Sequence, residues 1–315
     1  MKVIITGGTG FIGGYIAHEF IVMGYDVTLI VRNKSSIEYI KMKYQKYNFK
    51  ENIHFINSDL ENLDIKDFKH IKYDIWIHTA WGGVNREEIN DELVHYNNFI
   101  ISQKCIKIAH ELGCGVFCDT GSRAECGNDE DIISEYTQGL PINVYGSKKM
   151  DFYRYALAYS EKNNIKYIHF RLFSVTGVKD HPWSVVMLAC THFIKNENLT
   201  LGSCEQMWNY IDVRDVAKSI QLIVKKVISD DTYQYQELDN RIINIANFHS
   251  KKLREYIEEI HKLCDCTIPL SFGKEIGFDS NPDTTRLKTI LPELKQRVFS
   301  ETIKDILKSM SIYKG

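Results

Sequence analysis

Three polar side chains have the types and spacing needed for proton transfer: Ser122, Tyr145 and Lys149. Tyr145 and Lys149 are four residues apart, so on a helix they share one face. Because a nearby ammonium favours phenolate, we expect the pKa of Tyr145 to be lowered towards a value useful for acid–base work. Ser122 follows a predicted strand and can hydrogen-bond the same substrate oxygen. Such a pair also occurs by chance on exposed helices, so the interpretation depends on the elements that carry it.

The chain opens with a strand, a glycine turn and a helix. An apolar run at 3–5 leads into Thr6-Gly7-Gly8-Thr9-Gly10-Phe11-Ile12-Gly13, and apolar residues at helical spacing follow up to Gly24. Glycines permit a tight turn and a close approach of backbone to a pyrophosphate, and the helix start offers N–H groups to the phosphates. The predicted dinucleotide site consists of Gly7, Gly10, Phe11, Ile12 and Gly13.

The residues after the second predicted strand, 26–31, indicate which dinucleotide binds. An NAD site usually carries Asp or Glu about 20 residues past the glycines for the ribose hydroxyls, whereas Arg32, Asn33 and Lys34 follow the strand in this chain. A guanidinium and an ammonium attract a 2′-phosphate that a carboxylate would repel. NADPH is therefore favoured as the cofactor, with NADH possible. The alternative interpretation is a solvated basic loop.

Strands and helices alternate along the chain, which predicts an α/β protein with a Rossmann-type, doubly wound parallel sheet and a smaller C-terminal substrate-binding lobe. Further strands are predicted at 53–56, 74–78, 115–118, 167–173 and 242–245, and helices at 92–112, 146–162, 215–227, 251–263, 300–311 and through Ile37, Ile40 and Tyr44. The predicted dinucleotide domain is 1–173 with a return segment at about 210–246. The substrate lobe is 174–209 and 247–315.

Small and acidic residues stand at the carboxyl ends of two predicted strands, where ligands approach the backbone. Asp59 and Leu60 follow the third strand, and Ala80 follows the fourth. Asp59 can meet an adenine amino group or only cap the following helix. Together with Ala80, these residues are expected to contact the cofactor, and the neighbouring Trp81 is expected to contact substrate.

Composition argues against several other classes of protein. A chain of 315 residues, 44% of them hydrophobic, suits one or two globular domains. A net charge of −2 gives no basic field for nucleic acid or an anionic membrane, and no apolar run approaches the roughly 20 residues of a membrane span. The first strand begins at Lys2, which leaves no room for a signal peptide. Eight cysteines without metal-type spacing then indicate reduced thiols in a cytoplasmic protein without a metal site, with Cys264-Asp265-Cys266 interpreted as structural.

An ordered series of motifs resembles the extended short-chain dehydrogenase/reductases that act on nucleotide-diphosphate sugars. The matching segments are the glycine turn, Asp59-Leu60, Ala80, Asn98, Ser122, Tyr145-x-x-x-Lys149, Arg171-Leu172-Phe173, 210–217 and Asn244-Ile245. The resemblance implies a nicotinamide beside Tyr145, with its ribose held by Lys149. It implies that Tyr145 is the general acid/base and that Ser122 polarises the sugar oxygen. It also implies a homodimer paired through the helices at 92–112 and 146–162.

The resemblance leaves the reaction to be chosen among several. The family's 4,6-dehydratases carry a Thr-Asp-Glu pattern, whose Asp and Glu move protons on the sugar. The same positions here hold Ser122, Arg123 and Ala124. The cation of an arginine and the methyl group of an alanine cannot carry out this acid–base catalysis. Residues 121–127, Gly-Ser-Arg-Ala-Glu-Cys-Gly, are similar to the Gly-Ser-x-Ala-Glu-Tyr-Gly run of CDP-abequose synthases and related 4-keto-6-deoxy-sugar reductases. With the cofactor signal, this implies NADPH-dependent reduction of the C4 ketone of a dTDP- or CDP-linked 4-keto-6-deoxyhexose, for deoxysugar or O-antigen biosynthesis. The alternatives are a nucleotide-sugar 4-epimerase that retains NAD and a non-catalytic NADP-binding regulator.

Two substitutions leave the nucleotide of the substrate open. Many relatives carry Arg-Asp before the Tyr-Ile segment where this chain has Trp208-Asn209, and Ser174 stands in a slot that is often Asn. The substrate contacts expected in their place are Arg123, Ser174, Trp208, Arg214 and Arg286. The arginines would meet the diphosphate, and Trp208 would stack on a base or sugar. His181 is interpreted as a solvated loop residue.

Overall fold

The fold is known from a computed structural model that describes residues 1–32, 52–69, 71–128, 131–229 and 238–312. The chain divides into two compact units. The first comprises 1–127, 138–171 and 217–243, and the second comprises 128–137, 172–216 and 244–315. The predicted helix through Ile37, Ile40 and Tyr44 lies outside the described residues.

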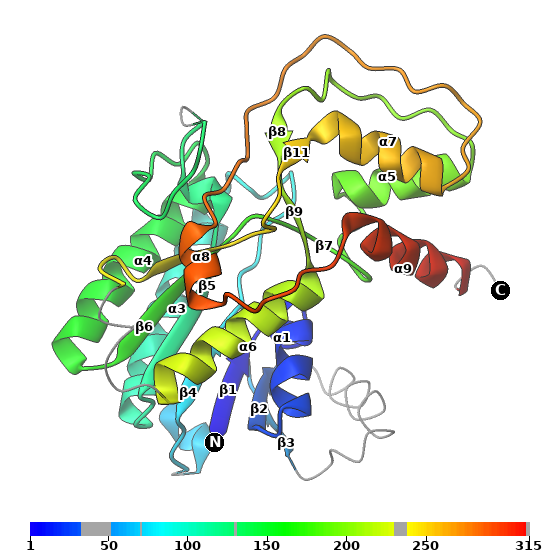
Figure 1. The fold of residues 1–315 in the computed structure, drawn as a ribbon. Helices are drawn as coiled ribbons and strands as arrows, with labels where there is room; N and C mark the ends of the chain where they lie inside the picture. Colours follow the sequence, from blue (N-terminus) through cyan, green and yellow to red (C-terminus); the bar gives the residue numbers. More distant parts are fainter. Residues whose placement is uncertain (33–51, 70, 129–130, 230–237, 313–315) are drawn as a thin grey trace. The chain divides into compact units, whose positions relative to one another are not determined.

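A seven-stranded sheet with the order β10-β6-β5-β4-β1-β2-β3 organises the first unit (Figure 1). The strands are β1 (Lys2–Thr6), β2 (Asp26–Val31), β3 (Ile53–Asn57), β4 (Ile75–His78), β5 (Val116–Ser122), β6 (Lys166–Leu172) and β10 (Ile242–Ile245). The pairs β1–β2, β2–β3, β1–β4 and β4–β5 are parallel. The sequence therefore correctly predicted a doubly wound α/β sheet.

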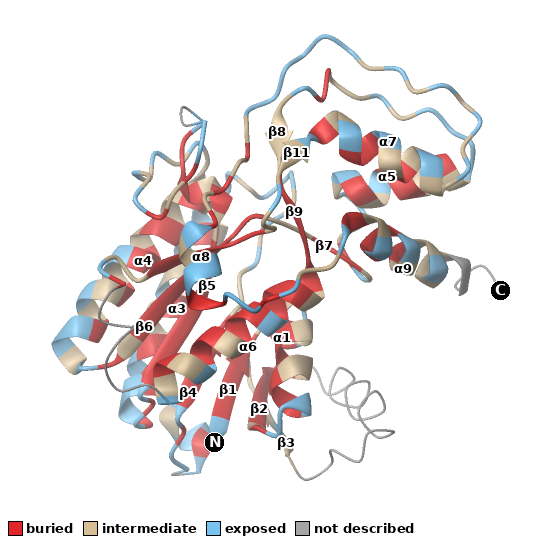
Figure 2. Cartoon of the chain, in the orientation of Figure 1, coloured by how far each residue is buried: buried red, intermediate tan, exposed pale blue. Residues whose placement is uncertain are grey.

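The central strand β4 is buried along its whole length and its neighbours β1 and β5 over most of theirs, as Figure 2 shows, because helices cover the sheet. Helix α1 (Phe11–Val22) packs on β1 and β2, while α3 (Glu92–Glu111) packs on β4 and α4 (Val144–Asn163) on β5. Helices α3 and α4 also pack on each other. Short 3-10 turns, η1 (Ile65–Phe68) and η2 (Arg123–Glu125), follow β3 and β5.

Two boundaries differ from the sequence prediction and both affect the candidate site. Strand β5 extends to Ser122, beyond the predicted end at 118, so this serine is the last residue of the strand. Helix α4 begins at Val144, two residues before the predicted start, because Asn143 caps it by accepting the N–H of Gly146 at 2.7 Å. Tyr145 therefore lies in the first turn of α4.

The second unit is built from short strand pairs and helices. Strand β7 (Ser174–Thr176) pairs in parallel with β9 (Tyr210–Asp212), and β8 (Met207–Trp208) pairs antiparallel with β11 (Lys251–Lys252). The helices are α5 (Val185–Ile194), α7 (Leu253–Leu263), α8 (Thr285–Ile290) and α9 (Phe299–Ile312), and α6 (Val213–Ser229) begins here and continues into the first unit. Apolar side chains of α5, α7 and α9 form one hydrophobic cluster. In the described ranges, none of the helices has the length and continuous apolar character that a bilayer crossing requires.

Candidate active site

The turn between β1 and α1 requires glycine at two positions. Gly7 has a φ of +77°, and a Cβ on it would lie 2.7 Å from the backbone nitrogen of Ala80. A Cβ on Gly13 would lie 2.2 Å from the carbonyl oxygen of Gly7. Gly10 caps the helix, and no side chain hydrogen-bonds the helix start. The turn therefore presents the N-terminal end of α1 to a phosphate, which fits the pyrophosphate of a dinucleotide.

The other predicted cofactor residues follow neighbouring strands. Arg32 is exposed directly after β2, and Asn33 and Lys34 lie outside the described residues. Asp59, after β3, is exposed, and its Oδ1 accepts the N–H of Glu61 at 3.4 Å, while Leu60 packs against the hydrophobic core. Ala80 follows β4. Because β4, β1, β2 and β3 are consecutive parallel neighbours, their carboxyl ends share one edge of the sheet.

The hydroxyl group of Ser122 is close enough to the phenol of Tyr145 to oppose the rise of its pKa. The Oγ of Ser122 also accepts the N–H of Ala124 at 3.1 Å, which leaves its own O–H to donate to the phenol. Lys149, one helical turn after Tyr145, is 3% exposed, and its Nζ donates to the carbonyl oxygen of Thr120 at 2.6 Å. The three predicted catalytic residues thus converge where β5 meets the start of α4.

Trp81 and His95 complete the surroundings of the phenol. The Nζ of Lys149 lies 4.1 Å from the ring centroid of Trp81, and the indole meets the Tyr145 ring edge-on at 6.2 Å between centroids. The Nε1 of Trp81 donates to Nδ1 of His95 at 3.1 Å. Sequence reasoning had assigned Trp81 to substrate and had not found His95. Nothing in the spacing of the chain signals a contact between residues on a loop and on α3.

The pKa values of Tyr145 and Lys149 are shifted mainly by burial. Burial raises the pKa of Tyr145 to about 12, a hydrogen bond from Ser122 opposes the rise, and the carboxylate of Glu125 adds to it. Burial lowers the pKa of Lys149 to about 8, although Asp119 and Glu125 favour its charged form. The expectation that Lys149 lowers the pKa of Tyr145 is therefore wrong for this structure. The free-energy cost of removing the phenolate from water exceeds the stabilisation that the neighbouring groups provide.

Arg123 and Ala124 follow Ser122 in η2. Arg123 is 8% exposed, its Nη1 donates to the carbonyl oxygen of Cys126 at 3.5 Å, and burial lowers its pKa. These are the two positions at which a 4,6-dehydratase is expected to carry its catalytic carboxylates. Neither side chain can donate or accept the proton that such an elimination requires.

The remaining predicted substrate residues belong to the second unit. Ser174 begins β7, and Trp208 contacts the ring of Phe278 at 5.7 Å between centroids. Arg214 donates to Asp212 at 2.6 Å and to Asp305 at 2.7 Å, so two carboxylates already neutralise its charge.

Two further residues of the second unit pair with aromatic side chains. Arg286 donates to the hydroxyl of Tyr136 at 2.9 Å. His181, expected to be solvated, is half-buried and stacks on Trp183 at 4.5 Å between centroids.

Comparison with known proteins identifies the family of this chain. A family model described as the NAD dependent epimerase/dehydratase family matches residues 3–246. This span includes the glycine turn, the strand ends and the Ser122–Tyr145–Lys149 group. The chain belongs to the NAD-dependent epimerase/dehydratase family.

Named members of the family resemble the chain over most of its length. A UDP-glucose 4-epimerase of Lactobacillus helveticus is 23% identical, with 92% of this chain and 91% of the relative covered. A dTDP-6-deoxy-L-talose 4-dehydrogenase (NAD(+)) of Aggregatibacter actinomycetemcomitans is 24% identical, covering 82% of this chain and 89% of that protein. The crystal structure of a UDP-glucose 4-epimerase from Thermotoga maritima, solved with UDP-glucose, superimposes with a TM-score of 0.82 at 18% identity over the whole of both chains. This structural likeness confirms the fold.

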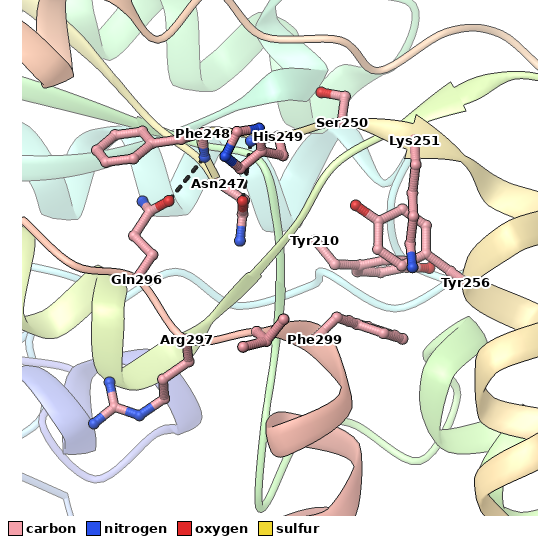
Figure 3. A pocket seen from close by; sticks show the side chains of 11 residues that line it. Tyr210, Asn247, Phe248, His249, Ser250, Lys251, Tyr256, Gln296, Arg297 and Phe299 are labelled. Carbon is pink, nitrogen blue, oxygen red and sulfur yellow. Dashed lines mark hydrogen bonds between the residues drawn. The ribbon is translucent and has the colours of Figure 1, made fainter.

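The second unit also contains a cavity of about 290 Å³, shown in Figure 3. Its walls come from β9, the segment after β10, the start of α7 and the segment before α9. Two cations line it, but Lys251 is ion-paired with Glu259 and Arg297 with Asp215. None of the catalytic, cofactor-binding or substrate-binding residues predicted from the sequence lines the cavity. It is therefore not part of the candidate active site.

Proposed function

We propose that the chain is a nicotinamide-dependent reductase of the C4 ketone of a dTDP- or CDP-linked 4-keto-6-deoxyhexose, acting in deoxysugar biosynthesis. The observation that carries the proposal is the convergence of Ser122, Tyr145 and the buried Lys149 where β5 ends and α4 begins. The Aggregatibacter relative is named for redox chemistry at C4 of a dTDP-linked deoxysugar, which supports the same class of reaction.

Each catalytic residue has one task in this proposal. The hydride would come from the nicotinamide when the cofactor is bound. Tyr145 donates the proton to the C4 oxygen, and its pKa of about 12 keeps the phenol protonated at neutral pH, as a proton donor must be. Ser122 donates a hydrogen bond to the phenol oxygen and stabilises the phenolate that remains. Lys149 holds the nicotinamide ribose by its ammonium group.

The cofactor is proposed to be NADPH, with its pyrophosphate on the turn of Gly7, Gly10 and Gly13 and its 2′-phosphate near Arg32. The exposed guanidinium of Arg32 at the end of β2 supports this choice, because it can pair with a phosphate dianion. NADH remains the alternative cofactor, since the Aggregatibacter relative is named as NAD(+)-dependent.

Ser174, Trp208, Arg214 and Arg286 are the substrate contacts proposed in the second unit. Trp81 and Arg123 are the substrate contacts proposed in the first. A homodimer is also proposed, because α3 leaves Leu93, Tyr96 and Ile100 exposed on its surface. Sedimentation of a single-chain species at micromolar concentration would contradict the dimer.

A 4-epimerase that retains NAD is the second candidate function, because the Lactobacillus relative carries that name. An epimerase and a reductase use the same Ser–Tyr–Lys core, so the core does not separate them. A non-catalytic NADP-binding regulator is the third candidate. The intact Ser122, Tyr145 and Lys149 group is an argument against it.

The deciding experiment follows NADPH and NADH consumption with dTDP- and CDP-4-keto-6-deoxyglucose, and identifies the product sugar by NMR. We expect oxidation of the cofactor in proportion to a C4-reduced product. Tyr145→Phe should lower kcat by roughly 10²–10⁴-fold while cofactor binding is preserved. Interconversion of UDP-glucose and UDP-galactose without added cofactor, with neither keto sugar reduced, would establish the epimerase. Tight cofactor binding without turnover of any of these sugars would support the regulator.

A further inference from the structure

A group of buried charged side chains lies next to Ser122. His169, on β6, is fully buried, with its Nδ1 3.0 Å from Oδ1 of Asp119 and its Nε2 2.9 Å from Oε2 of Glu125. Both carboxylates are buried as well. Each ring nitrogen faces a carboxylate oxygen, and a carboxylate can only accept, so both nitrogens carry a proton and the imidazole is charged.

Glu125 connects this charge with the catalytic serine. Its Oε1 accepts the backbone N–H of Ser122 at 2.6 Å, while its Oε2 accepts from His169. Asp119 precedes Ser122 by three residues and Glu125 follows it by three. One imidazolium therefore binds both ends of the segment that carries Ser122.

Gly121 makes room for this arrangement. A Cβ at this position would lie 2.1 Å from Nε2 of His169 and 2.6 Å from Oε1 of Glu125. These distances are far shorter than any van der Waals contact, so the backbone approaches the imidazole as only glycine allows. Gly121 therefore leaves the space that the imidazole of His169 and the carboxylate of Glu125 occupy.

The electrostatics of the group agree with its geometry. Burial lowers the pKa of His169, but Asp119 and Glu125 overcome this and raise it to about 9. The ionised Glu125 in turn raises the pKa of Tyr145 and favours the charged form of Lys149. Several charged and titratable groups face His169 or its two partners. They are His78 on β4, Cys118 and Asp119 on β5, Glu125 on η2, Tyr145, Lys149 and Tyr153 on α4, and Tyr167 and Arg171 on β6.

We propose that His169, through Asp119 and Glu125, is a positioning residue that holds Ser122 in place beside Tyr145, with its hydroxyl available to donate to the phenol. The proposal rests on the proposed function for the part that Tyr145 plays in proton transfer. Without the imidazolium, Asp119 and Glu125 lose the group that joins them. The N–H of Ser122 then loses a fixed acceptor, and its hydroxyl loses its alignment on the phenol.

A double-mutant cycle with Ser122→Ala tests whether His169 acts through the serine. In the wild-type background, His169→Gln should lower kcat by about 10- to 100-fold with KM nearly unchanged. In the Ser122→Ala background the same substitution should change kcat less than about twofold. Glu125→Gln keeps an oxygen for the N–H of Ser122 and should give an intermediate loss. Equal effects of His169→Gln in both backgrounds would mean a purely structural role and would overturn the proposal.

His78→Gln is the matched control for the loss of a buried histidine. His78 ends β4 and is fully enclosed, with its ring nitrogens bonded to the hydroxyls of Thr6 and Ser102 at 2.7 and 2.8 Å. Its side chain makes no hydrogen bond to the Ser122 segment among the described contacts, although its backbone pairs with Asp119 in the sheet. We expect whatever effect His78→Gln has on kcat to be equal in the two backgrounds.

A second measurement needs no substrate and so separates this proposal from the proposed function. In ¹⁵N-labelled protein at pH 7, both ring nitrogens of His169 should be protonated, and the amide proton of Ser122 should be shifted far downfield by its bond to Glu125. His169→Gln should move that amide resonance, and His78→Gln should not. A neutral His169 at pH 7, or a Ser122 amide that ignores His169→Gln, would refute the positioning role even if every keto sugar proved inactive.

Discussion

Trp81 joins three groups around the phenol of Tyr145. Its face receives the ammonium of Lys149, its ring meets Tyr145, and its Nε1 donates to His95. The other nitrogen of His95 lies 3.0 Å from the carbonyl oxygen of Glu88. Because the indole can only donate and the carbonyl can only accept, His95 is neutral with its proton on Nε2. Burial, which lowers the pKa of His95, agrees with this tautomer. The indole is therefore fixed in orientation, and so is the surface on which the ammonium lies.

Substitution of Trp81 should lower the pKa of Lys149. A cation–π contact favours the charged form by about 0.5–2 kcal/mol, which corresponds to a fall of roughly 0.4–1.5 pKa units from the value of about 8 when Trp81→Leu removes the ring. Trp81→Phe keeps an aromatic face and should cause a smaller fall. Lysine side-chain NMR titration measures both. An unchanged pKa of Lys149 in Trp81→Leu would remove the indole from its electrostatics.

The turn that leads into α1 has room for a side chain at one glycine of the helix but not at its neighbour. Gly13 and Gly14 are neighbours in the first turn of the same helix. A Cβ on Gly13 would collide with the carbonyl oxygen of Gly7 at 2.2 Å, whereas a Cβ on Gly14 would meet the carbonyl oxygen of Gly8 at an ordinary 3.5 Å. The two positions therefore separate the need for close packing from the general helix propensity of glycine.

Gly13→Ala should destabilise the protein by about 1–3 kcal/mol through overpacking and should abolish dinucleotide binding. Gly14→Ala should leave binding intact and stabilise the protein by up to about 1 kcal/mol, because alanine is the better helix former. Urea denaturation and NADPH titration calorimetry measure the two effects. Equal behaviour of the two variants would mean that the turn does not require glycine at 13.

Long elements with clear start and stop signals could be predicted from the sequence. Helix α3 was expected at 92–112 and spans Glu92–Glu111, because Asp91 caps its start by accepting the N–H groups of Leu93 and Val94. The strand expected at 242–245 was also found. Strand β5 was placed too short, since its last residues, Asp119 to Ser122, are polar and read as a loop. Their burial depends on partners that a local pattern does not contain.

Elements that depend on distant partners could not be predicted. Strands β7, β8, β9 and β11 have two or three residues each, too few for an alternating pattern, and exist only through pairing. The charged group at His169 was missed for the same reason. Its carboxylates are 44 and 50 residues away along the chain. By contrast, the Tyr145–Lys149 pair was found because both residues lie on one helix.

At the scale of the whole molecule, each unit has its own apolar core and its own buried ion pairs. In the first unit, a cluster of aromatic and aliphatic side chains surrounds Trp76. In the second, Asp212 accepts from Arg214 and from the hydroxyl of Thr302, which ties β9 to α9. Burying such charges costs free energy unless they are paired and hydrogen-bonded. The stability of the chain should therefore depend on pH through its buried titratable groups.

Two buried histidines should place the stability maximum near pH 6.5. Burial lowers the pKa of His78 to about 3, so acid favours the unfolded chain and stability falls as the pH drops below the unfolded value of 6.5. The raised pKa of His169 acts in the opposite sense. Its contribution is complete below pH 6.5 and is lost as the pH rises through about 9. Lys149, with a folded pKa of about 8 and an unfolded value of 10.5, adds stability with pH mainly above about 8.

The interval from pH 6.5 to 8 therefore tests His169, which makes the largest contribution to the pH dependence there. Over these 1.5 units the contribution of His169 to the free energy of unfolding should fall by about 1.6 kcal/mol, less than a full proton at 1.36 kcal/mol per unit would give, because the unfolded imidazole is half-protonated at pH 6.5. His78 and Lys149 together offset about 0.8 kcal/mol of this fall, so the whole chain should lose about 1 kcal/mol. Urea denaturation at pH 6.5 and pH 8 measures the fall. In His169→Gln the free energy of unfolding should no longer fall over this interval. In His78→Gln the fall should persist and deepen slightly, because the unfolded His78, half-protonated at pH 6.5, opposes it in the wild type. A wild-type stability that stays constant or rises between these pH values would mean that His169 is neutral in the folded protein.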